Sequence, residues 1–123
     1  MATKTLGQQR AAHAWEAVER AARAMGDNFA KEFGDRAKKM PMQIRASGLG
    51  QVVAFLRAKG YAEGVRGALA GWLSVQKITR SDSPDALMEL FRNGTAADLR
   101  RATAESLAYL EWLMRFADAR KKG

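Results

Sequence analysis

Apolar residues recur along most of the chain with the three-and-four spacing of an amphipathic helix, in which side chains four residues apart share a face. The first such stretch covers residues 6–25, with Trp15 in its apolar stripe, and Gly26-Asp27 predicts a helix end followed by an N-cap. A second helix is predicted over 28–40, because Pro41 forces the residue before it out of helical angles. Four of its residues are predicted to face the core: Phe29, Phe33, Ala37 and Met40.

Glycine, proline and short polar segments divide the rest of the chain. A short helical piece is predicted at 41–46, and a helix at 51–58, with Phe55 in its apolar stripe, follows the joint 47–50. The next helix is predicted at 61–75 and is followed by a loop. A short helix then begins at Ser83-Pro84 and ends at Asn93-Gly94, and the last helix begins at a Thr95–Asp98 capping box and runs toward Lys121. No stretch alternates with the period of a β-strand. The predicted fold class is therefore all-α, as a single-domain bundle of five to six helices over residues 1–123.

Two of these helices have faces that predict close contact with another element. In the helix at 61–75, glycine and alanine share one face, although each interior glycine costs about 1 kcal/mol of helix stability relative to alanine. That face fits either internal helix packing or the close approach of a partner subunit. The last helix carries Tyr109, Trp112 and Phe116 beside its main apolar stripe. It is either the central helix of the bundle or a helix whose aromatic edge meets another protein.

Composition narrows the classes of function. With 123 residues, 47% hydrophobic and 28% charged, the chain has the composition of one globular domain. It has no cysteine, which excludes disulfides and thiolate metal sites, and its one histidine, His13, is predicted to be an exposed bystander. No apolar run approaches the roughly 20 residues that span a bilayer, and the N-terminus lacks the apolar stretch of a secretory signal. A cytoplasmic protein with no membrane partner is expected.

No set of residues has the spacing of a catalytic or metal site. Glu105, Glu111 and Asp118 are not spaced as a carboxylate–histidine metal set. Gly48-Leu49-Gly50 is only a fragment of a dinucleotide-binding fingerprint. It fits a tight turn between helices, although the N–H groups of the following helix would also suit a phosphate. We therefore expect no enzyme activity, no cofactor, no metal and no small-molecule substrate.

The positive charge is concentrated in one segment. The chain has 21 Lys and Arg against 13 Asp and Glu, a net charge of +8. Residues 36–81 contain nine of the basic residues and one acid, Glu63, so this segment carries the whole net charge. A segregated basic region is typical of a polyanion partner, usually nucleic acid. The alternative is a solvated basic face that keeps the protein soluble.

Three blocks of sequence, taken in order, resemble one known family. They are Gln9-Arg10-Ala11 with Ala14-Trp15, then Lys38-Lys39-Met40-Pro41 with Ile44 and Ser47-Gly48-Leu49-Gly50-Gln51-Val52-Val53-Ala54-Phe55-Leu56, and last Tyr109-Leu110-Glu111-Trp112-Leu113-Met114-Arg115-Phe116-Ala117. Over nearly its whole length the chain is similar to the small subunit of the type III-B (Cmr) CRISPR RNA-guided effector complex. One departure is Ser47, where the family's asparagine is expected, and both residue types cap helices.

The resemblance implies an all-helical, non-catalytic subunit of a ribonucleoprotein that acts in antiviral defence. Several copies would stack on one another inside the particle and face its backbone subunits. The implied partners are other Cmr-type subunits, both backbone and large, and the crRNA–target RNA duplex. In that family, cleavage of the target belongs to the backbone subunits.

The residues expected to contact RNA lie in the part of the basic segment that contains no acid: Lys38, Lys39, Arg45, Arg57 and Lys59. Few exposed aromatic residues are expected there, which favours tracking of the RNA backbone over base stacking. For each of these residues a solvated surface position is the alternative. Two other classes of function are a free-standing histone-like helical protein that binds duplex DNA, and a regulatory protein that binds an acidic protein partner. The sequence leaves open the copy number, the subunit interfaces and whether the isolated subunit binds RNA.

Overall fold

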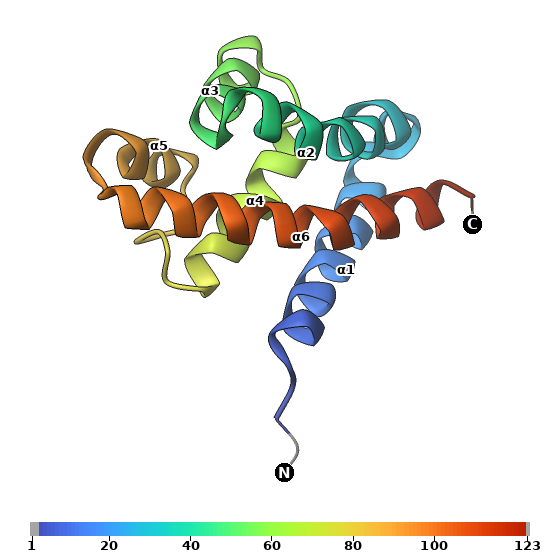
Figure 1. The fold of residues 1–123 in the computed structure, drawn as a ribbon. Coiled ribbons are helices and arrows are strands. Elements are labelled where there is room, and N and C mark those ends of the chain that lie inside the picture. Colours follow the sequence, from blue (N-terminus) through green and yellow to red (C-terminus); the bar gives the residue numbers. More distant parts are fainter. Residues whose placement is uncertain (1–2, 123) are drawn as a thin grey trace.

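Every regular element of the structure is helical. The computed structural model describes residues 3–122, apart from the side chains at 84 and 122. Within that range the elements are α1 (Leu6–Met25), η1 (Gly26–Asn28, a 3₁₀ turn), η2 (Phe29–Asp35, π-helical), α2 (Arg36–Ser47), α3 (Leu49–Lys59), α4 (Glu63–Val75), α5 (Pro84–Asn93) and α6 (Ala96–Lys122) (Figure 1). The all-α fold class is confirmed, and the first helix has the predicted bounds.

The long helix α6 is the centre of the fold. The helix α1 crosses it, and α2, α4, α5 and η2 also pack against it (Figure 1). The residues of α6 that are buried recur with helical spacing: Ala102, Ser106, Tyr109, Leu110, Leu113 and Ala117. The interpretation of the last helix as the central one is therefore confirmed.

Side-chain caps begin the first and last helices. The Thr5 hydroxyl accepts from the Gln8 N–H at 3.1 Å, and the Gln8 side chain accepts from the Thr5 N–H at 2.8 Å. The predicted capping box before α6 is also present, because the Asp98 N–H donates to the Thr95 hydroxyl and the Thr95 N–H donates to the Asp98 carboxylate, both at 3.1 Å. Such caps satisfy backbone donors that have no partner within the helix.

The segment after α1 differs from the prediction in two ways. Asp27 is not an N-cap, since the chain passes through η1 and η2 into α2 without a side-chain cap. Pro41 does not end the helix, because α2 continues through it to Ser47 and buries it. An interior proline costs about 3 kcal/mol, so the packing of α2 against α6 outweighs the local preference. The four residues predicted to face the core here are all buried: Phe29, Phe33, Ala37 and Met40.

The buried apolar side chains form one cluster between the helices. Its largest enclosed members include Trp72, Tyr109, Phe33 and Met40. Two aromatic residues that the sequence placed in apolar stripes are instead at the surface: Trp15 is 47% exposed and Phe55 is 53% exposed. Each lies on the flank of its helix's buried stripe, where helical periodicity alone does not decide burial.

Candidate nucleic-acid interface

The helices α2 and α3 meet in a corner at Gly48. The Gly48 N–H donates to the Ile44 carbonyl at 2.8 Å and ends α2, while the Gly48 carbonyl accepts from Val52 and begins α3. Gly48 has φ +89°, which glycine adopts at little cost. A Cβ on Gly50 would lie 3.0 Å from the Phe91 ring, so this glycine allows α3 to approach α5 closely. These contacts favour the interpretation of this joint as a tight turn between helices.

The residues predicted to contact RNA are all exposed, three on α2 and two on α3. Four of them make no hydrogen bond or ion pair with any described residue, and we call them the basic corner: Lys38, Lys39, Arg45 and Lys59. Residues 36–62 contain no acid at all. The corner therefore presents positive charge that the described part of the chain does not neutralise.

The fifth predicted residue, Arg57, differs from the other four. Its Nη2 lies 2.5 Å from Oδ1 of Asp85, at the start of α5. Both side chains are largely exposed, so this pair contributes at most about 1 kcal/mol. Asp85 is 28 residues away along the chain, and only the packing of α5 beside α3 brings it to Arg57.

The basic corner has two sides. On α2, Lys38 and Arg45 are seven residues apart and lie on the side away from α3, whereas Lys39 lies on the side of Gln43, one turn further along. On α3, Lys59 lies on the side of Phe55. Helical spacing therefore places Lys39 and Lys59 on the helix sides that carry Gln43 and Phe55, and the other two cations on the other side of α2.

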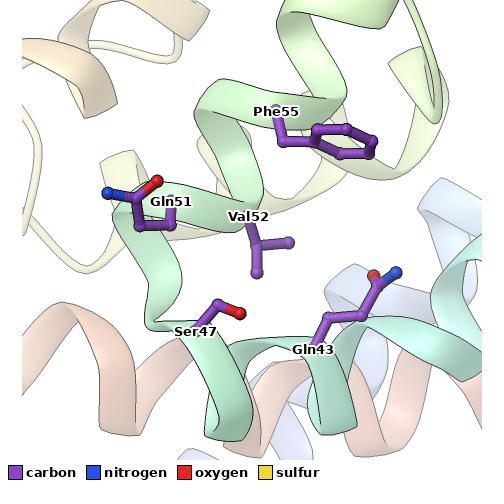
Figure 2. A pocket seen from close by; sticks show the side chains of 5 residues that line it. All are labelled: Gln43, Ser47, Gln51, Val52 and Phe55. Carbon is purple, nitrogen blue, oxygen red and sulfur yellow. The ribbon is translucent and has the colours of Figure 1, made fainter.

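A groove of about 480 Å³ lies between α2 and α3. Figure 2 shows Gln43 and Ser47 on the α2 side and Gln51, Val52 and Phe55 on the α3 side. The two amides and the hydroxyl make no hydrogen bond with any described residue. Sequence reasoning missed this groove, because it depends on the angle between the two helices at Gly48.

Large hydrophobic side chains are exposed on and after α2. Met42 is 76% exposed, and Tyr61, just beyond α3, is 39% exposed. The Arg36 guanidinium lies over the Tyr61 ring, 4.1 Å from its centroid, at the end of α2 away from Gly48. Phe55 and Tyr61 are thus the two exposed aromatic residues of the basic segment, few in number as expected but both close to its cations in sequence. Cations with exposed rings suit contact with both phosphates and bases.

Polar groups inside the protein link three helices. Glu105 on α6 accepts from Nε and Nη2 of Arg10 on α1, at 2.5 and 3.0 Å, and from the indole N–H of Trp72 on α4 at 2.9 Å. The hydrogen bond from Arg10 is the main reason that the pKa of Glu105 lies below its ordinary value. Arg10 and Glu105 are far apart in sequence, so no local pattern indicated this cluster. Its geometry ties helices together and orients no reactive group toward a cavity.

His13 belongs to the same region and is not the exposed bystander that the sequence predicted. Its Nδ1 lies 2.7 Å from the Tyr109 hydroxyl, and its ring packs edge-on against Trp72 and Tyr109, with both centroids at 5.4 Å. Burial, and to a lesser extent Arg20, lower the pKa of His13, while burial raises the pKa of Tyr109. His13 is therefore a half-buried residue that packs between α1, α4 and α6.

Residues 3–122 contain neither a metal-binding cluster of side chains nor a membrane-spanning helix. Within that range, no three His, Cys, Asp or Glu side chains come together in a way that would hold a metal ion. The same described residues include no helix with the length and apolar character needed to cross a membrane.

An aromatic cluster lies where α1 crosses α6, away from the basic corner. Trp15 packs edge-on against Phe116 at 5.3 Å between centroids, and Trp112 lies 5.7 Å from Phe116. Trp15 and Trp112 are 47% and 38% exposed. Of the aromatic residues expected along the edge of the last helix, Trp112 is exposed beside Trp15 of α1, Phe116 is partly buried and Tyr109 is fully buried.

A second groove, of about 490 Å³, lies between α1 and α4 and is lined mainly by small residues. A Cβ on Gly64 would lie 3.0 Å from the Phe33 ring, whereas a Cβ on Gly67 would meet no atom within 4 Å. The glycine face thus divides between internal packing at Gly64 and open surface at Gly67. The α1 residues of this groove include Ala24, which lies on the opposite flank of α1 from Trp15.

These features define a small all-α protein with a central helix, an unneutralised basic corner, an exposed aromatic cluster and a groove lined mainly by small residues. The chain belongs to the family described as CRISPR-associated protein (Cas_Cmr5), whose model matches residues 6–120. It is 34% identical over 116 residues to the CRISPR system Cmr subunit Cmr5 of Thermus thermophilus, covering 94% of this chain and 96% of the relative.

A solved structure agrees with this assignment. The X-ray crystal structure of a CRISPR-associated Cmr5 family protein from Thermus thermophilus superposes with a TM-score of 0.79 and 31% sequence identity. The match covers 94% of this chain and 97% of that one. The resemblance to the small subunit of the type III-B Cmr complex is thereby confirmed.

Proposed function

We propose that this chain is a non-catalytic small subunit that stacks in several copies in a type III-B Cmr particle and contacts the backbone of the target RNA. Its partners are then other Cmr subunits, itself and the crRNA–target RNA duplex. Family membership supports the place in the complex. The observation that carries the RNA contact is the basic corner, whose four exposed cations have no partner among the described residues.

The chemistry of the corner fits phosphate contact. Three of its four cations are lysines, which bind phosphates as flexible point charges. Because the cations lie on two sides of α2 and α3, successive phosphates of a strand that crosses the corner can each meet one of them. Single contacts of this kind are weak, and stacked copies along one strand would bind with an avidity far above the affinity of a single copy.

The test is a reconstituted Cmr particle in which the four corner residues are changed together to Gln. RNA affinity is measured over a range of salt concentrations. Each lost phosphate contact is expected to reduce the steepness of the log–log salt dependence by about 0.7, or about 2.8 for all four. The matched control removes the same charge from four exposed cations elsewhere: Lys4, Lys31, Arg92 and Arg100. An unchanged slope in the corner variant, with the particle intact, contradicts the RNA contact.

For the stacking, we propose that the aromatic cluster of one copy meets the α1–α4 groove of the next. The two surfaces lie on opposite flanks of α1, so the contact is heterologous and repeats head to tail. Small residues at the groove, such as Gly67, leave room for bulky rings. Complementary shape of this kind is typical of stable interfaces.

Native mass spectrometry of the particle tests this contact by counting small subunits. Trp112→Ala on one surface and Gly67→Gln on the other should each lower the number of copies. Val75→Ala is the control, because Val75 is 59% exposed at the end of α4 and belongs to neither surface. A full set of copies with both variants contradicts the proposed interface.

The place in the complex is tested by affinity purification of the chain from its native cells. Recovery with larger Cmr subunits and with short RNAs that share a repeat-derived end supports the proposal. Recovery alone or with bulk DNA would instead favour the histone-like alternative.

A further inference from the structure

The α2–α3 groove combines an exposed ring with unused hydrogen-bonding groups. Phe55 stands on the α3 side with 53% of its surface exposed, and Val52 forms an apolar floor beside it (Figure 2). Gln43, Ser47 and Gln51 supply two amides and a hydroxyl, none bonded to a described residue. The volume of about 480 Å³ lies within the range of small-ligand sites.

Two cations of the basic corner lie one helical turn beyond the lining of this groove, toward the ends of α2 and α3 that are far from Gly48. Lys39 lies one helical turn before Gln43, and Lys59 lies one turn after Phe55. At the same end, the Arg36 guanidinium stacks on Tyr61. An apolar ring surface with polar edges thus has a cation one helical turn away on each helix, and residues 36–62 contain no acid that would repel a phosphate.

We propose that this groove binds one unstacked base of an RNA strand, with the base on the Phe55 ring and the adjacent phosphates at Lys39 and Lys59. The Gln and Ser side chains would hydrogen-bond the edge of the base. Aromatic rings that accept splayed bases are a common means of binding single-stranded RNA. This inference rests on the proposed function and adds a base-binding subsite to a surface otherwise expected to contact phosphates alone.

The lining of the groove favours RNA over a protein partner. The cores of protein interfaces are depleted in lysine, yet Lys39 and Lys59 each lie one helical turn beyond a residue that lines this groove. A docked apolar helix would also bury the amides of Gln43 and Gln51 without partners, at a cost of about 1–3 kcal/mol for each such group. A nucleotide offers phosphates to the lysines and hydrogen-bonding groups on its base to the amides.

The experiment compares Phe55→Leu, Phe55→Tyr and the Val75→Ala control within the reconstituted Cmr particle. Loss of stacking in Phe55→Leu should weaken RNA binding by about 5- to 100-fold, whereas Phe55→Tyr, which keeps a ring, should stay within about twofold of wild type. The salt dependence should not change in either variant, because no phosphate contact is removed. This distinguishes the base subsite from the basic corner, whose removal is expected to flatten that dependence.

An RNA strand with one abasic nucleotide, moved stepwise along the target, locates the bound base. At the correct position the missing base should weaken binding to wild type and have no further effect on Phe55→Leu. A 5-iodouridine at that position should crosslink to the peptide that contains Phe55.

Two results would overturn the inference. In the first, Phe55→Leu binds RNA with wild-type affinity while the salt dependence of the corner variant is still reduced. This result would refute the base subsite but not the proposed function. The other is exclusion of Phe55→Leu from the particle, which would make the groove a protein interface. If the corner variant keeps both the RNA affinity and the salt dependence of wild type, the proposed function itself is refuted.

Discussion

Replacing Glu105 tests whether the polar cluster inside the protein stabilises the fold. Its carboxylate receives two hydrogen bonds from Arg10 and one from the Trp72 indole, and so joins α1, α4 and α6. The side chains of Arg10 and Glu105 are only 21% and 12% exposed. Solvent therefore screens this pair much less than it screens a surface salt bridge.

The expected cost follows from the groups left without a partner. Glu105→Gln keeps an oxygen for the Trp72 N–H but places an amide N–H₂ against the Arg10 donors, and the loss of charge-assisted bonds costs about 1.5–3 kcal/mol. Glu105→Ala also leaves the indole N–H of the buried Trp72 without an acceptor. We expect a loss near 3–5 kcal/mol for this variant, about the cost of breaking a buried ion pair.

Urea denaturation of the isolated subunit, followed by far-UV circular dichroism, measures these changes. The midpoint should fall in the order wild type, Glu105→Gln, Glu105→Ala, with an unchanged m-value. Glu16→Gln is the control, because Glu16 is an exposed acid on α1, and its change should stay within about 0.5 kcal/mol. A Glu105→Gln variant as stable as that control would refute the role assigned to Glu105.

The same pair has a defined pH dependence. The pKa of Glu105 in the folded protein lies below its ordinary value of 4.5. The stability that its ionisation contributes is therefore present above pH 4.5 and is lost as the pH falls through the folded-state pKa. The difference in stability between wild type and Glu105→Gln should accordingly shrink on acidification. A difference that stays constant down to about pH 3 would contradict the depressed pKa.

Four further substitutions have expected outcomes in the isolated subunit. The pKa of His13 lies below 6.5 when folded, so wild type should lose stability relative to His13→Gln as the pH falls from about 8 to 5; parallel pH profiles would contradict this. Gly67→Ala should raise the urea midpoint by an equivalent of about 0.5–1 kcal/mol, because a Cβ there meets no atom, whereas Gly64→Ala should gain less or lose stability against Phe33. Thr95→Ala should cost about 1 kcal/mol by removing the α6 cap, with the exposed Thr3→Ala as its neutral control in the same denaturation assay.

Several features that depend on local spacing were predicted correctly from the sequence, whereas the local signals at Asp27 and Pro41 were misleading. Helical periodicity gave the first helix its correct bounds, and the Thr95–Asp98 pair indicated the cap that begins α6. The buried residues Phe33 and Met40 followed from the same period. The exposure of the predicted RNA contacts also agrees with their charge, because lysine and arginine are costly to bury without a partner.

The family could likewise be predicted from sequence. The block from Lys38 to Leu56, with the aromatic block near the C-terminus, was enough to indicate the Cmr small subunit, and the comparisons confirmed it. That inference came from resemblance and not from composition, since charge and helices alone also fitted a histone-like protein.

Only the tertiary structure decided which residues from distant segments meet. It placed Asp85 against Arg57, joined Arg10 to Glu105, and exposed Phe55 beside a groove that exists because α2 and α3 diverge at Gly48. A helical period fixes the direction in which a side chain leaves its own helix, but not what lies in that direction. The packing of the helices determines which charges pair, which side chains at the edge of a buried stripe are exposed, and where grooves form. That packing results from many weak contacts over the whole chain.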